Sequence, residues 1–106
     1  MSNLFEEREK GYEAKWAHDE EKHFKVMARR NELLGRWAAG ELRLRETEAN
    51  DYATAVIHTG LVNKGADAVF DKIRKDFDAA KIVHSDRVIH HKMEEFFHVA
   101  SEEVAG

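Results

Sequence analysis

The chain contains no proline in 106 residues, and this absence constrains its fold more than any other feature. Proline interrupts a helix because it lacks a backbone N–H and its ring clashes with the preceding turn. Helices in this chain can therefore be long, and its few glycines mark the predicted joints. These joints lie around Gly40, around Gly60 and Gly65, and before Ser85. They divide the chain into an N-terminal arm and four amphipathic segments.

Each of the four segments carries apolar residues at the spacing of one helix face. The stripes are Phe24, Met27, Ala28, Leu34 and Ala38, with Trp37 on the flank; Ala49, Tyr52, Ala53, Val56 and Ile57; Val69, Phe70, Ile73 and Phe77; and Ile89, Met93, Phe96, Phe97 and Ala100. Gly60 is predicted to close the second helix, and Ser85 is predicted to cap the last one. Four helices with one apolar face each bury those faces together, so we predict an all-α four-helix bundle.

The N-terminal arm has a stripe of its own, formed by Leu4, Phe5, Tyr12 and Trp16. The stretch "AHDEEKH" then separates this stripe from Phe24, where the first bundle helix is predicted to begin. A lone helix of ~16 residues is marginal in water. We therefore predict a mobile, partly helical arm over residues 1–19 that folds against a partner, followed by a bundle over 20–106. Spacing alone leaves open a fifth helix folded back on the bundle.

Composition argues against several classes of protein. The 21 acidic and 17 basic residues give a net charge of −4, so no broad positive field attracts nucleic acid. Cysteine is absent, which excludes disulfides and thiolate chemistry. No apolar run reaches the ~18 residues of a membrane span, and no signal peptide is recognisable. The expected location is cytoplasmic, without direct insertion into a membrane.

No catalytic or metal site is predicted. Two Glu-x-x-His spacings, Glu20 with His23 and Glu95 with His98, match the number that a carboxylate-bridged metal pair in a helical bundle requires. Helical geometry, however, directs Glu95 and His98 toward water and leaves Glu20 alone on the inner side of its helix. The sequence also has no phosphate-binding glycine loop and no nucleophile with a paired base. We therefore expect a protein that is not an enzyme.

The arm and the first bundle helix carry a family resemblance. The stretch "FEEREKGYEAKWAHDEEKHFKVMARRNELLGRWAA", residues 5–39, resembles the zeta subunit of F-type ATP synthases of certain bacteria, a small ATPase inhibitor. Its most specific parts are "KWAHDEE" and "ARRNELLGRWAA", and weaker agreement continues through "GADAVFDKIRKDFD" and "SDRVIHHKMEEF". The resemblance implies a four-helix bundle preceded by a flexible arm. That arm would insert at a catalytic interface of the synthase head and block rotation in the hydrolytic direction.

The resemblance also assigns candidate sites. The expected partner-binding residues of the arm are Leu4, Phe5, Arg8, Tyr12, Lys15, Trp16, His18 and Asp19. Three of them, Phe5, Tyr12 and Trp16, are the expected aromatic anchors. The basic residues Arg29, Arg30 and Arg36 are candidates for binding a phosphate group or for docking to the synthase. No metal ligand is assigned.

The partners follow from the same resemblance. It implies the alpha and beta subunits of the head, and also gamma, with the protein monomeric when free and peripheral to the inner membrane. No cofactor is implied, although weak binding of an adenine nucleotide is compatible with the family. The alternative interpretation is a free-standing helical adaptor that binds another protein through the bundle surface.

Overall fold

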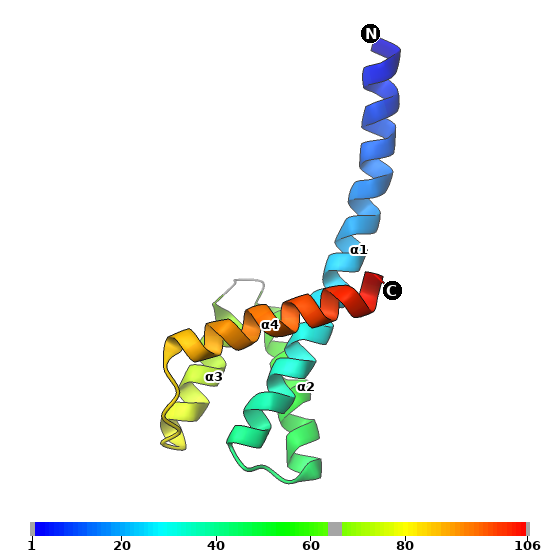
Figure 1. Ribbon diagram of the computed structural model, residues 1–106. Coiled ribbons are helices and arrows are strands. Elements are labelled where there is room, and N and C mark those ends of the chain that lie inside the picture. Colours follow the sequence, from blue (N-terminus) through cyan, green and yellow to red (C-terminus); the bar gives the residue numbers. More distant parts are fainter. Residues whose placement is uncertain (1, 64–66, 106) are drawn as a thin grey trace.

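The computed structural model describes the backbone of residues 2–63 and 67–105, and the side chains within these ranges from Glu20 onward. In these ranges it contains four α-helices and no strand. They are α1 (Ser2–Glu41), α2 (Glu46–Val62), α3 (Ala68–Ala79) and α4 (Asp86–Ala105) (Figure 1). The predicted all-α fold with four helices is therefore confirmed.

The first helix is much longer than the others. It has 40 residues, and a rise of 1.5 Å per residue gives about 60 Å, close to the 61 Å length of the whole molecule. The stretch "AHDEEKH" does not interrupt it, so the bundle's first helix does not begin after this stretch as predicted. Alanine, glutamate and lysine are good helix formers. Losing the apolar stripe there removes packing surface but leaves the backbone hydrogen bonds intact.

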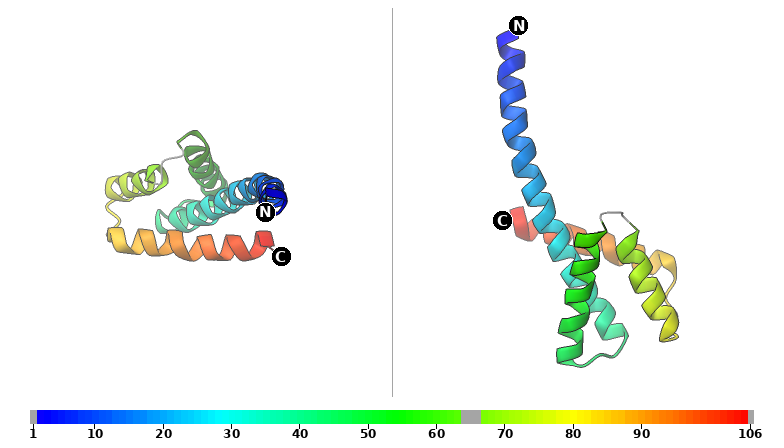
Figure 2. Two further views of the ribbon diagram at one scale, coloured as in Figure 1. Left: turned by 90° about the horizontal axis from the view of Figure 1, so that it is seen from above. Right: turned by 180° about the vertical axis from the view of Figure 1, so that it is seen from behind.

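The helices pack around the C-terminal half of α1. α2 returns antiparallel to it and α4 runs across it, while α3 lies between α2 and the start of α4 (Figures 1 and 2). The N-terminal half of α1 projects away from the other helices, as Figure 1 and the right panel of Figure 2 show. The α1–α2 and α3–α4 connections lie at the opposite end of the bundle from this projection.

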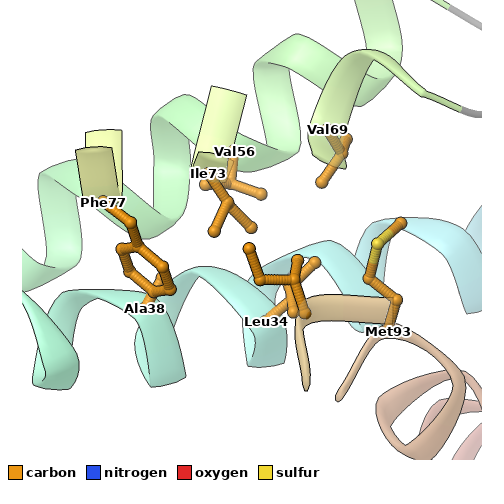
Figure 3. Packing of buried hydrophobic residues seen from close by; sticks show 8 residues of the cluster. Leu34, Ala38, Val56, Val69, Ile73, Phe77 and Met93 are labelled. Carbon is orange, nitrogen blue, oxygen red and sulfur yellow. The ribbon is translucent and has the colours of Figure 1, made fainter. Parts of the chain in front are cut away.

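One apolar core joins all four helices. Its buried members are Leu34, Ala38, Val56, Val69, Ile73, Phe77, Ile89 and Met93. Side chains from α1, α2, α3 and α4 converge there (Figure 3). Phe77 is the largest fully buried side chain, whereas Phe70 and Phe97 are only partly buried. The helical stripes therefore identified the inward faces, but they did not distinguish the central ring from rings at the margin.

The predicted stripe of α1 is wrong at its N-terminal end. Phe24 is 57% exposed, and the first buried side chain of α1 is Val26, at 8%. Phe24 is exposed because α2 does not reach it. Gly60 of α2 lies against Asn31 of α1, and α2 ends two residues later, at Val62. A stripe on α1 cannot be buried where no helix runs beside it.

The prediction that Gly60 closes α2 is wrong, because the helix continues to Val62. A Cβ at this position would lie 2.3 Å from Nδ2 of Asn31, a buried amide on α1. Glycine is present because the Asn31 side chain occupies the space that a larger residue would need. The position is a close contact between helices and not a helix end.

Three helix ends follow recognised capping patterns: the start of α4 and the ends of α1 and α3. The Ser85 hydroxyl accepts a hydrogen bond from the Val88 backbone N–H at 3.3 Å, so its predicted role as N-cap of α4 is confirmed. Arg43 and Lys81, which follow α1 and α3, both have φ of 60°. The next residue after each donates back across the turn, Leu44 to Ala39 and Ile82 to Phe77. This is the Schellman arrangement, in which glycine is the usual residue.

Candidate protein-binding site

The projecting half of α1 is the part of the fold that a partner can surround. No other helix lies beside it in Figure 1 or in the right panel of Figure 2. All eight predicted arm residues, from Leu4 to Asp19, belong to this half of the helix. Their side chains lie outside the part of the chain whose side chains are described. The fold therefore places these positions on one helix clear of the bundle.

The junction between arm and bundle spans residues 20–25. All six side chains are exposed, and Lys25 pairs with Glu21 at 3.6 Å, one turn earlier. Such a pair at an i,i+4 spacing supports the helix slightly. The junction therefore continues the helix without contributing to the core, and Phe24 is its one large apolar side chain.

An ion pair fixes α4 to α1 where the bundle begins. Arg29 donates from Nε to Oε2 of Glu103 at 2.6 Å and from Nη2 to Oε1 at 3.3 Å. The hydrogen bonds to Glu103 and, to a smaller extent, the one to Glu32 raise the pKa of Arg29. In turn, the hydrogen bond from Arg29 lowers the pKa of Glu103. The C-terminal end of α4 is thus held against α1 only a few residues after the junction.

The second arginine of the predicted basic cluster is turned toward the α1–α2 contact. Arg30 is partly buried and donates from Nε and Nη2 to Oδ1 of Asn31 at 2.9 and 2.7 Å. Burial lowers the pKa of Arg30 because it disfavours the charged form. This guanidinium group helps to hold the buried amide in place.

The third arginine, Arg36, joins α1 to α2. It donates to Oδ1 of Asn50 at 2.8 Å and contacts Glu32 at 3.5 Å. Arg29 and Arg36 thus share Glu32 between them, whereas Arg30 is directed at Asn31. A phosphate group would have to compete with these protein acceptors for each of the three arginines.

The histidines of the last segments lie in different surroundings. His84 packs against the rings of both Trp37 and Phe77, and its Nε2 is 3.1 Å from Oε2 of Glu41. His90 stacks on Phe70 with ring centroids 4.2 Å apart. Both contacts tie the start of α4, or the loop before it, to other helices. They serve packing between helices.

The paired Glu-x-x-His spacings do not assemble into a centre. Glu95 and His98 are exposed, as predicted, and line a shallow depression on α4 with His91, Glu94 and Val99. Glu20 is exposed too, so its predicted place on the inner side of α1 is wrong, for the same reason that Phe24 is exposed. Within the described ranges, no group of three or more histidines and carboxylates is placed to hold a metal ion.

Sequence reasoning did not single out the close packing of α1 on α2. Gly35 and Asn31 of α1 are both buried against α2, at Ala53 and Gly60 respectively. A signal was present, because Asn31 stands in line with Phe24, Leu34 and Ala38 on the predicted stripe. A polar residue at such a position indicates a buried hydrogen-bonded group.

Fold and site together define a class: a small helical protein with one core shared by four helices and a first helix that extends well beyond it. Within the described ranges, no helix has both the length and the apolar character needed to cross a lipid bilayer. The family model for ATPase inhibitor subunit zeta matches residues 1–103, and the chain belongs to this family. It is therefore a regulatory, inhibitory subunit of an ATPase, and the family implies binding to an ATP synthase.

A solved structure supports the same architecture. That structure, determined by solution NMR, belongs to a protein that is 32% identical in sequence to the present chain, and the two folds superpose with a TM-score of 0.67. The match covers 77% of the present chain and 93% of the other. No curated protein sequence is significantly similar to the chain.

Proposed function

We propose that the chain inhibits ATP hydrolysis by inserting the projecting half of α1 at a catalytic interface in the head of an F-type ATP synthase. The observation that carries this proposal is the extension of α1 well beyond the bundle, as one uninterrupted helix (Figure 1). A helix that reaches out alone can enter a groove between subunits without unfolding the core. Membership of the inhibitor family supplies the target.

The binding arm is residues 2–19, and its aromatic anchors are Phe5, Tyr12 and Trp16. Large aromatic side chains contribute most to binding when they fill dry pockets at the centre of an interface. Exposed charges around them mainly affect register and association rate. The groove is formed by the alpha and beta subunits, with gamma adjoining it, and occupying it blocks rotation in the hydrolytic direction.

The folded bundle remains outside the groove when the arm is inserted. Its core is closed by contacts among all four helices, so it stays folded whether or not the arm is bound. The proposal requires no cofactor and places the protein at the cytoplasmic face of the membrane through the synthase. Any adenine nucleotide that binds does so weakly, because Arg29, Arg30 and Arg36 already have acceptors within the chain.

Deletion of residues 2–18 tests this mechanism. The truncated protein should lose inhibition of ATP hydrolysis by the purified cognate head while keeping its melting transition, because the backbone of this part of α1 projects away from the other helices (Figure 1). Truncated protein that inhibits as strongly as the full chain would refute the arm mechanism and favour the bundle as the binding surface.

Single substitutions within the arm sharpen the test. Trp16→Ala should weaken inhibition about thirtyfold, since truncating a large aromatic anchor costs about 2 kcal/mol. Glu7→Ala is the matched control and should change inhibition by less than about fivefold, because an exposed charge pair contributes ~0–1 kcal/mol. Equal effects of the two substitutions would contradict the assignment of the anchors.

A further inference from the structure

Phe24 is the one exposed phenylalanine, tyrosine or tryptophan in the part of the chain whose side chains are described. It is 57% exposed, whereas every other phenylalanine, tyrosine and tryptophan in that part is partly or fully buried. The ring contributes little to the core. It lies in the junction, the six exposed residues that α1 presents before it enters the bundle.

The position of Phe24 on α1 is fixed relative to the bundle by contacts of the residues that follow it. Val26 is already buried two residues later, and Arg29 is bonded to Glu103 of α4 one turn after Phe24 and Lys25. The same helix continues without a break toward the arm. A partner surface that encloses the arm can therefore reach Phe24 without any bend in α1.

The surroundings of Phe24 on the helix surface indicate what would receive it. Residues three and four positions apart are neighbours on a helix, so Met27 and Ala28 adjoin the ring on the bundle side and Glu20 and Glu21 on the arm side. Met27 and Ala28 are partly exposed, and both glutamates are exposed. The surface is an apolar patch flanked on the arm side by two glutamates, of which Glu21 pairs with Lys25 and Glu20 has no ion pair among the described side chains.

We propose that Phe24 is an additional anchor of the inhibitor, seated in an apolar pocket with a basic rim on the ATP synthase head. The contact extends the bound surface beyond residues 2–19 to the base of the bundle. This inference rests on the proposed function, since it takes the synthase head as the partner. The rim is expected to be basic because Glu20 and Glu21 are acidic, and opposite charges on the two surfaces favour this orientation of binding.

The test is a titration of the cognate head's ATP hydrolysis with full-length variants. Phe24→Ala should raise the half-inhibitory concentration at least about tenfold, as expected for an anchor residue. Alanine is a better helix former than phenylalanine, so weaker inhibition could not be attributed to a less helical arm. The melting temperature should be unchanged or higher.

Val83→Ala is the matched control. Val83 is 96% exposed in the α3–α4 connection, at the end of the bundle away from the arm. Its substitution removes a similar exposed apolar group and should leave inhibition unchanged. Phe24→Leu, which keeps an apolar side chain, should retain most of the inhibition.

The outcomes separate this inference from the proposed function. If deletion of residues 2–18 abolishes inhibition while Phe24→Ala inhibits within about twofold of the natural chain, the Phe24 contact is refuted and the arm mechanism stands. If the deletion has no effect, the arm mechanism itself fails. Reversing charge with Glu20→Lys and Glu21→Lys should weaken inhibition more at low salt than at ~0.5 M, where exposed charges are screened. Equal inhibition by the reversed variant at low salt would refute the basic rim.

Discussion

Gly35 of α1 lies so close to Ala53 of α2 that a Cβ added to the glycine would be 2.8 Å from the Cα of Ala53. The same Cβ would be 3.2 Å from Cβ of Val56. Non-bonded carbon atoms prefer separations of about 3.5–4.0 Å. The two helix backbones therefore meet directly at Gly35, and this contact sets the spacing of α1 and α2 beneath the arm.

Gly35→Ala should destabilise the bundle by about 1–3 kcal/mol, the usual cost of overpacking a close contact. The neighbouring atom belongs to the α2 backbone, so it cannot move aside as the end of a side chain could. Gly40→Ala is the control, because nothing lies within 4 Å of a Cβ at that position in α1. It should be neutral or stabilising by up to about 1 kcal/mol, since alanine favours a helix over glycine. Urea denaturation of both variants measures the difference, and equal stabilities would contradict the direct contact.

Phe77→Ala should destabilise the protein by about 3–5 kcal/mol, because it removes a fully buried ring and leaves a cavity. The ring also makes an edge contact with Trp37 at a centroid distance of 5.6 Å. Phe97→Ala is the comparison within α4 and should cost clearly less, since Phe97 is only partly buried. Thermal melts of the two variants test this order, and a larger loss for Phe97→Ala would show that the core is centred elsewhere.

Sequence periodicity predicted the inward faces of α2, α3 and α4 because the apolar stripe of each helix contributes to the shared core. Val56, Ile73 and Met93 are all buried, as their stripes indicated. Periodicity failed at Phe24 because it gives the direction of a side chain but not the point where neighbouring helices end. That point depends on the length and register of α2, which are determined by tertiary contacts.

The candidate site was predictable in part. The position of the arm at the start of the chain and its stripe of aromatic residues were visible in the sequence, and α1 carries those positions clear of the bundle. The role of Arg29 was not predictable, because its acceptor on α4 is brought to it only by folding. Glu103, the partner of Arg29, lies 74 residues away in sequence. No local pattern encodes such a pair.

Tyr52 should make stability sensitive to alkaline pH. Its hydroxyl donates to Oδ2 of Asp76 at 2.8 Å, and burial, followed by this hydrogen bond, raises the pKa of Tyr52. A raised folded-state pKa contributes stability that is fully present below the unfolded value of about 10 and is lost as the pH rises above it toward the folded-state pKa. Stability measured by urea denaturation should therefore fall above about pH 10.

Tyr52→Phe provides the control for this pH dependence. The variant should lose about 1 kcal/mol at neutral pH, the usual net contribution of a hydrogen bond, and its stability should fall less steeply above about pH 10. Asp76 would keep Lys72, whose Nζ is 3.1 Å away, so the carboxylate is not left alone. An identical alkaline slope in the two proteins would show that Tyr52 is not the group responsible.

Amide hydrogen exchange should divide α1 into two halves although its backbone is one helix. Residues 31–39 include Leu34, Ala38 and Ala39, which are fully buried against other helices, so their amides should exchange only on opening of the core. Residues 2–19 have no neighbouring helix in the fold, and Gly11 lowers the helix stability there by about 1 kcal/mol relative to alanine. An isolated helix of this length is marginal, so these amides should exchange much faster, consistent with a mobile arm in the free protein. The measurement is amide hydrogen exchange, monitored by NMR on the isolated chain, with residues 89–100 of α4 as an internal reference. Protection across residues 12–16 equal to that of residues 31–39 would contradict a mobile arm and favour a fifth helix packed on the bundle.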